Sequence, residues 1–184
     1  QRSTVSAERK LDYWDRIFLQ AQELLLDDSP EAAGKKKEMV EQLSRIVIGR
    51  ERRILSLARD YFTLEDLVQI KDRLIGTGFI GGKSVGMLLA RNILRQDTSQ
   101  SWEARLERHD SYYIGSDVFY AYMVQNGWWR LLMTQKTPEG YFETARELRE
   151  KMLSGTFPEE IKEQFRLMLE YFGQSPIIVR SSSL

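Results

Sequence analysis

The sequence predicts an α+β protein that is rich in helices and contains only a small sheet. Most of the chain, including nearly all of residues 4–60, carries apolar side chains at the 3.6-residue spacing of amphipathic helices. Only residues 112–115 and 176–180 favour strands, because both runs are rich in aromatic or β-branched side chains. The 184 residues are enough to bury a core and to form one or two domains.

The N-terminal region predicts two long helices joined by a short break. Residues 27–30 read D-D-S-P, in which Ser29 suits an N-cap and Pro30 the first helical position. The second helix is expected to continue through Ile46 to Leu57. The two helices should form an antiparallel hairpin within an extension of residues 1–73, and this hairpin is a candidate homodimer interface. Its first helix carries an apolar stripe of Leu11, Trp14, Ile17, Phe18, Ala21, Leu24 and Leu25.

A glycine-rich loop follows a short helix that Thr63 and Asp66 should cap. Residues 76–84 read G-T-G-F-I-G-G-K-S and precede an amphipathic helix. Glycines at a helix N-terminus let a phosphate approach the free backbone N–H groups, and Lys83 adds a positive charge beside them. On local sequence alone, a loop that merely turns before a helix, with Lys83 solvated, explains the residues equally well.

Three nucleotide motifs compete for this loop. Its glycines match G-x-G-x-x-G, but the dinucleotide fingerprint requires a preceding strand, and residues 64–74 look helical. The P-loop pattern misses by one position, since Thr77 stands where a glycine is needed. The kinase-type loop fails because Lys83 occupies the place of its valine.

The last third of the chain predicts three helices and a final strand. The helices should begin at Ser116–Asp117, at Glu143 and at Glu159, and the strand should span residues 176–180. A buried strand that ends in Arg180 and serines would place a charged planar fork beside hydroxyl donors, which suits a phosphate. Side chains expected to face the core are Val118, Phe119, Tyr122, Met123, Trp128, Trp129, Ile161, Phe165, Met168, Leu169 and Phe172.

Composition limits the classes of function. The 27 lysines and arginines balance the 27 aspartates and glutamates, so no overall field attracts nucleic acid or an anionic membrane. The absence of cysteine rules out disulfides and thiolate metal sites, and no apolar run is long enough to cross a membrane. We expect a cytoplasmic protein without a signal peptide and with neither nucleic acid nor membrane as a partner.

The motifs, taken in order, resemble one family. The G-G-K turn, S-D-V-F at 116–119, F-P-E-E at 157–160 and P-I-I-V-R-S-S at 176–182 are similar to the N-terminal nucleotide-binding domain of the pyruvate phosphate dikinase and phosphoenolpyruvate synthase family. The resemblance covers residues 81–184, and residues 1–70 carry no motif of the family. It implies an ATP-grasp-type fold, of which residues 74–184 would form the first, incomplete portion.

The resemblance also implies a site and a reaction. In the family, ATP phosphorylates a histidine on a separate domain, and the phosphate then passes to pyruvate to give phosphoenolpyruvate. The chain is therefore expected to be a fragment of an ATP-dependent phosphotransferase, with the Mg²⁺ ligands and the phosphohistidine and acceptor domains beyond it. It would have no catalytic residue or metal ligand of its own, and His109 matches no family motif. The residues expected to contact the phosphates of ATP are Gly81, Gly82, Lys83, Arg180, Ser181 and Ser182.

Two other interpretations remain open. The chain could be a non-catalytic assembly or regulatory module, a helical hairpin joined to a degenerate nucleotide-binding half. A Rossmann-type oxidoreductase would require a strand leading into Gly76 and an acidic partner for the ribose, and the sequence shows neither. The ATP site implied by the family resemblance predicts that Lys83 and Arg180 lie near one another across a cleft.

Overall fold

The computed structural model describes residues 12–99, 101–102, 104–107, 110–135, 138 and 141–181. Helices dominate this part of the chain, and a single pair of short strands forms a parallel sheet. The elements, in chain order, are α2 (Tyr13–Leu25), α3 (Ala32–Val47), α4 (Arg52–Tyr61), α5 (Leu64–Asp72), β1 (Leu74–Ile75), α6 (Gly82–Gln96), β2 (Tyr113–Ile114), α7 (Ser116–Gln125), α8 (Trp129–Gln135), α9 (Tyr141–Met152) and α10 (Glu159–Phe172).

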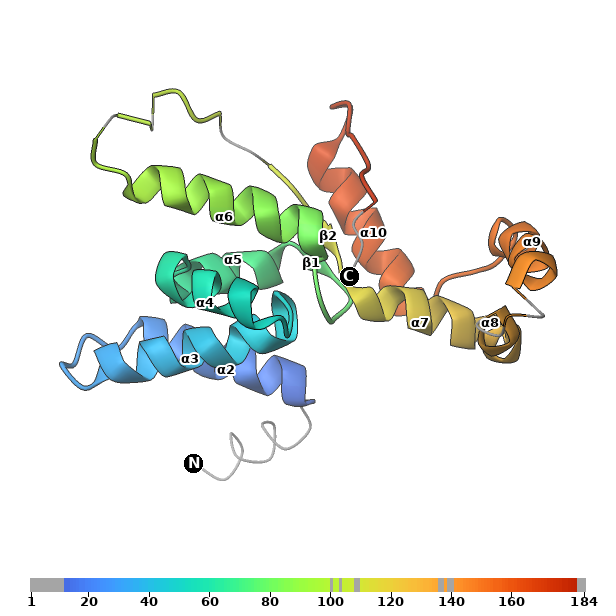
Figure 1. Ribbon diagram of the computed structural model, residues 1–184, viewed down its shortest axis with the longest axis horizontal. Helices are drawn as coiled ribbons and strands as arrows, with labels where there is room; N and C mark the ends of the chain where they lie inside the picture. Colours follow the sequence, from blue (N-terminus) through green and yellow to red (C-terminus); the bar gives the residue numbers. More distant parts are fainter. Residues whose placement is uncertain are drawn as a thin grey trace.

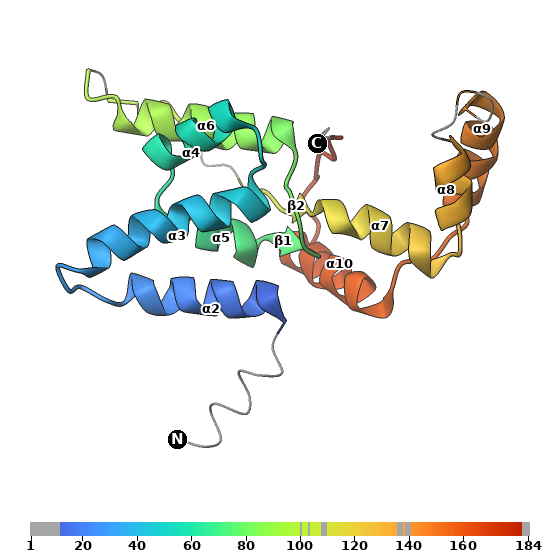
Figure 2. The same cartoon turned by 60° about the horizontal axis from the view of Figure 1, so that its bottom comes forward.

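The molecule has two unequal parts on either side of the sheet. Helices α2–α6 stack together, while α7 leads away from the sheet to α8 and α9 at the far end, and α10 lies beside the sheet (Figures 1 and 2). We call α2–α6 the N-terminal stack and α7–α9 the arm. The predicted α+β class with a small sheet is confirmed.

The predicted helical hairpin is present, but its second helix is shorter than expected. Helices α2 and α3 lie antiparallel (Figure 1). Helix α3 ends at Val47, because Gly49 is a poor helix former and the Glu51 carboxylate caps a new helix. Its oxygens accept from the backbone N–H groups of Arg53 and Ile54 at 2.9 and 3.1 Å. A continuous apolar stripe therefore spans two helices, α3 and α4.

The start of α3 also differs from the prediction. Ser29 is not its N-cap, since the helix begins at Ala32. The backbone N–H of Ser29 instead donates to the carboxylate of Asp27 at 2.9 Å, which makes a local turn before the helix. By contrast, the predicted cap of α5 is confirmed. Thr63 and Asp66 form a reciprocal capping box, with bonds of 2.9 and 3.2 Å.

One core joins the N-terminal stack. Ile17, Phe18 and Ala21 of the predicted stripe are buried, whereas Leu11 lies outside the described residues. Helix α6 adds Val85, Leu88 and Leu89 to the same cluster as α2–α5. The core thus contains residues from both sides of the predicted boundary at residue 73, and that boundary stays a prediction.

The expectation that residues 64–74 are helical is wrong at its end. Helix α5 stops at Asp72, and Leu74 and Ile75 form β1, in register with Tyr113 and Ile114 of β2. A two-residue strand is too short to show an alternating pattern, and its partner lies far along the chain. The glycine loop is therefore entered from a strand after all.

The helices after β2 have smaller cores. Helix α7 begins at Ser116, with Gly115 as its N-cap, and it ends at Asn126 and Gly127 as predicted. Its Tyr122 and Met123 pack with α8 and α9, and its Val118 packs with Ile75 and α10. Helix α8 was not predicted. Three side chains expected to be buried are exposed, because the arm and α10 are covered on one side only: Phe119, Trp129 and Leu169.

The predicted strand at residues 176–180 does not form in the described chain. These residues follow α10 without joining the sheet, and Ile178 and Val179 are each 81 % exposed. A β-prone run needs a neighbouring strand to satisfy its backbone groups, and β1 and β2 are paired only with each other here. The run is also not buried, which corrects the second part of the same prediction.

Candidate functional site

The glycine loop, residues 76–81, is held from both parts of the molecule. On one side, the N–H of Ile80 donates to the carbonyl of Val47 at 3.0 Å. On the other, the N–H of Gly76 donates to Gln164 Oε1 of α10 at 2.6 Å. The start of α7 also binds the loop, as described next. The loop therefore lies where the N-terminal stack, the sheet and α10 meet.

The first turn of α7 binds the glycine loop through reciprocal hydrogen bonds. Ser116 Oγ accepts from the N–H of Phe79, and the carbonyl of Phe79 accepts from the N–H of Ser116, both at 3.0 Å. Thr77 Oγ1 donates to Asp117 Oδ2 at 2.8 Å. A Cβ on Gly78, whose φ is +92°, would collide with Ser116 Oγ, and one on Gly115 would collide with the carbonyl of Thr77. Glycine is thus required on both sides of this contact.

The N-terminus of α6 has the features of an anion site. Gly81 is its N-cap, with φ +80°, and no side chain of the described residues caps the first turn. Gly81 is buried, whereas Gly82 and Lys83 at the start of the helix are exposed. Uncapped N–H groups at a helix N-terminus and a neighbouring lysine favour a negatively charged ligand.

Lys83 reaches the segment that carries Arg180. Its Nζ donates to the backbone carbonyl of Ser181 at 2.7 Å, a contact between residues 98 positions apart. The structure therefore brings Lys83 and Ser181 together, and the exposed Arg180 precedes Ser181 in the chain. Ser182 and His109 lie outside the described residues.

Neither the groove beside Arg45 and Arg52 nor the hollow beside Arg73 and Arg91 is lined by Gly81, Lys83 or Arg180. The predicted cleft between Lys83 and Arg180 therefore stays a prediction. No group of three or more metal-binding side chains occurs in the described ranges. None of the described helices is long and apolar enough to cross a membrane.

An arginine that the sequence prediction did not single out fastens α10 to the sheet. Arg73 donates to the Tyr171 hydroxyl at 2.9 Å and pairs with Asp110 at 3.5 Å. Its guanidinium also lies 4.1 Å from the ring centroid of Tyr171 and 4.9 Å from that of Tyr112. The hydrogen bond that Arg73 donates to Tyr171 is the main cause that raises the pKa of Arg73. Only tertiary contacts reveal this cluster, because its members lie far apart in the sequence.

The local structure around the loop includes part of what a dinucleotide site needs. Strand β1 leads directly into Gly76, and Asp117 follows β2, so the expectation that no strand precedes the loop was wrong. This geometry alone is compatible with both the dinucleotide and the dikinase interpretation. The decision between them comes from the longer pattern of the chain.

A comparison with protein-family models supplies that pattern. The model for the pyruvate phosphate dikinase, AMP/ATP-binding domain, matches residues 77–184, which is more than half of the chain. The chain belongs to this family. A search of curated proteins and a search of solved structures each found no match.

The resemblance noted at residues 81–184 is thereby confirmed, and it extends back to Thr77 inside the glycine loop. The dikinase family places the loop in a domain that binds AMP or ATP and that serves kinase-like phosphotransferases. Helices α2–α5 and strand β1 lie outside the matched residues. The loop therefore joins the AMP/ATP-binding domain to helices that the family model does not include.

Proposed function

We propose that this chain holds the phosphates of ATP between the G-G-K turn and the segment that carries Arg180. The observation that carries the proposal is the hydrogen bond from Lys83 to the carbonyl of Ser181, because it joins the two family motifs across the fold. The open N-terminus of α6 supports it, since an anion there would meet uncapped N–H groups.

Each proposed residue has a distinct task. Gly81 and Gly82 let a phosphate approach the main chain, and Lys83 compensates its charge. Arg180 would add a planar fork from the other side, with the hydroxyls of Ser181 and Ser182 as further donors. ATP supplies the phosphoryl group, and these residues orient it and stabilise the charge that shifts during transfer.

The wider reaction follows from the family. We propose that the phosphoryl group goes first to a histidine on another domain of the same protein and then to pyruvate or a similar acceptor. Mg²⁺ would be bound by residues beyond this chain, and the protein would work in the cytoplasm. Residues 1–73 would form a helical extension and residues 74–184 the incomplete nucleotide-binding domain, with the α2–α3 hairpin available for a homodimer.

One observation favours a second candidate function. The N-terminal stack packs directly on α6 and on the glycine loop, through the shared core and the bond between Ile80 and Val47. A non-catalytic module that uses the nucleotide-binding half for assembly or regulation would have the same contacts. Such a module would fold without retaining ATP.

Calorimetric titration with ATP tests the main proposal. Wild-type chain should bind ATP, and Lys83→Ala and Arg180→Ala should each weaken binding at least tenfold, as expected for charge-assisted bonds to phosphate. Matched controls are Lys37→Ala on α3 and Arg146→Ala on α9, which remove the same charges at exposed sites away from the loop. In the complete phosphotransferase, each of the two site variants should slow turnover by raising the activation free energy by about 2–4 kcal/mol.

A further variant separates the tether from the phosphate contact. Lys83 bonds to the backbone carbonyl of Ser181, so Ser181→Ala keeps that bond and removes only the hydroxyl. Reduced ATP affinity in this variant would support a hydroxyl contact with phosphate. Unchanged ATP affinity in both Lys83→Ala and Arg180→Ala would reject the proposed site. A wild-type chain that does not bind ATP would favour the non-catalytic module.

A further inference from the structure

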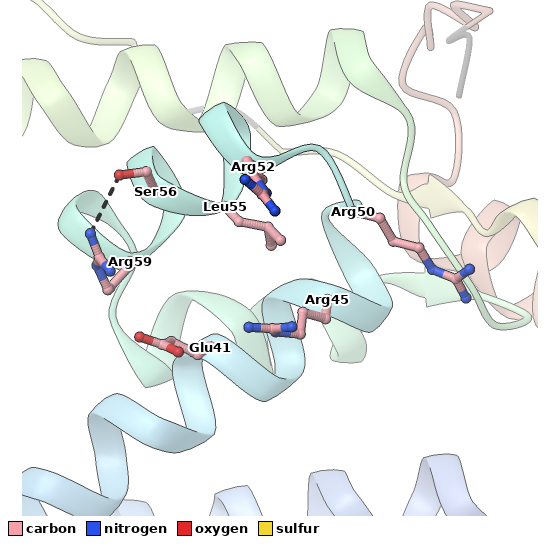
Figure 3. A pocket seen from close by; sticks show the side chains of 7 residues that line it. All are labelled: Glu41, Arg45, Arg50, Arg52, Leu55, Ser56 and Arg59. Carbon is pink, nitrogen blue, oxygen red and sulfur yellow. Dashed lines mark hydrogen bonds between the residues drawn. The ribbon is translucent and has the colours of Figure 1, made fainter.

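A groove between α3 and α4 gathers four arginines outside the residues that the family model matches. Its volume is about 470 Å³, and Figure 3 shows its lining side chains. The lining consists of Glu41, Arg45, Arg50, Arg52, Leu55, Ser56 and Arg59. Four arginines against one glutamate leave a surplus of three positive charges in the groove, although the chain as a whole has no net charge.

The sequence explains why the arginines share one groove. Arg52, Ser56 and Arg59 are spaced by four and three residues on α4, so they lie on one face of that helix. Arg45 comes from the last turns of α3, which packs against α4. The connection between the helices is short, and it turns α4 back over α3 (Figure 3). The basic face of α4 thus meets Arg45 of α3 in one place.

Nearby carboxylates do little to neutralise the groove. Glu51 is used as the cap of α4, where its oxygens accept from two backbone N–H groups. Asp60 pairs with Arg59 at 3.4 Å, and both side chains are more than half exposed, so this pair is weak. Glu41 is the one acidic side chain that lines the groove.

The four arginines differ in how they are held. Arg59 donates to Ser56 Oγ at 3.4 Å, and the guanidinium of Arg50 lies 5.8 Å from the ring of Phe79 in the glycine loop. Figure 3 shows Arg50 directed away from the other three. Among the described residues, the side chains of Arg45 and Arg52 have no hydrogen-bond or ion-pair partner. These two guanidinium groups are therefore available to a ligand.

We propose that this groove binds a small ligand that carries two or more phosphate groups. Guanidinium forks match phosphate oxygens in a bidentate geometry, and at least two forks are uncommitted here. The volume is within the usual range of small-molecule sites. An extended nucleic acid is disfavoured, because the surplus charge is confined to one corner of a chain with no net charge.

Tripolyphosphate is the probe for the groove, titrated calorimetrically into the full chain at low ionic strength. We expect a saturable site in the groove whose affinity falls as salt is added, in addition to any probe bound at the proposed ATP site. Arg45→Ala and Arg52→Ala should each weaken binding roughly tenfold or more, and Arg52→Lys should recover only part of the loss. Glu41→Gln should tighten binding several-fold, because it removes from the groove a negative charge that repels the phosphates of the probe.

Two controls locate the site. Arg53→Ala removes the same charge from the same helix but lies outside the groove, and it should leave the affinity unchanged. Because the proposed ATP site can also take tripolyphosphate, the groove variants are compared in a Lys83→Ala background as well, where the loss caused by Arg52→Ala should persist. Arg50 is left intact in these variants because of its contact with the glycine loop.

Circular dichroism of each variant checks that it folds before binding is compared. Equal losses in Arg45→Ala and Arg53→Ala would overturn the proposal, since only general charge would be at work. A loss confined to Lys83→Ala would overturn it by placing the probe at the glycine loop. Tighter saturable binding of a mixed-sequence oligonucleotide, lost in Arg52→Ala, would overturn it in favour of a nucleic-acid surface.

Discussion

The N-terminal stack and the arm with α10 differ in the size of their hydrophobic cores. Helices α2–α6 share one continuous core, whereas the helices after β2 depend on two small clusters and leave large apolar side chains exposed. The family match nevertheless lies on the second region and includes only α6 of the first. The comparison teaches that the glycine loop of the AMP/ATP-binding domain is held from both regions: α3, outside the matched residues, binds it through Val47, and α7 and α10, inside them, supply its other hydrogen bonds.

The largest expected effect tests the two cores directly. Leu67→Ala empties a fully buried position in the stack and should cost about 2–5 kcal/mol, since the removed methyl groups leave a cavity. Leu148→Ala on α9 removes the same atoms from a small, partly open cluster and should cost about 2 kcal/mol or less. Denaturant unfolding of both variants measures the difference. Equal losses would contradict the contrast between the regions.

The next effect concerns the contact that joins the two regions. Gly115→Ala places a Cβ against the backbone carbonyl of Thr77 and should destabilise the protein by about 1–3 kcal/mol, because backbone cannot move as freely as a side chain. Gly86→Ala is the matched control. It lies within α6 with nothing near its added Cβ, and it should stabilise by about 0.5–1 kcal/mol. Thermal unfolding of both variants checks the opposite signs.

A smaller effect is expected at the cap of α5. Thr63→Ala removes half of the capping box and should cost about 1 kcal/mol. Thr156→Ala, which replaces an exposed threonine beside the arm, is a suitable comparison because Thr156 bonds to Asn126 through its backbone N–H and carbonyl, which the substitution keeps. A cost at Thr63 no greater than that at Thr156 would show that the box adds little to the stack.

The last effect is absent at neutral pH and confined to alkaline pH. Burial raises the pKa of Tyr113 to about 12, so the folded state keeps a proton that the unfolded state releases near pH 10. Stability is therefore unaffected below pH 10 and should fall between pH 10 and about 12. Tyr113→Phe should flatten that part of the stability profile. Unfolding midpoints measured between pH 10 and about 12 test this difference. The same pH dependence in both proteins would show that the Tyr113 hydroxyl has an ordinary pKa.

The candidate site was predictable where its signals are local. The G-G-K turn, the helix behind it and the capping box at Thr63 all depend on neighbouring residues, and the positive φ of Gly81 agrees with its role as a helix N-cap. The contact of Lys83 with Ser181 follows from a family pattern rather than from any physical signal in the two segments. The cluster around Arg73 has no local signal, and the arginine groove has one only within α4, because Arg45 joins it through the packing of α3 against α4.

The sequence by itself determined the helical class, most helix ends and the order of motifs that identifies the family. Tertiary structure alone decided that Leu74 and Ile75 form a strand and that Ile178 and Val179 stay exposed. The physical reason is the range of the interactions. Helix bonds and caps are made within a few residues, whereas a strand or a buried face exists only when a distant segment supplies its partner.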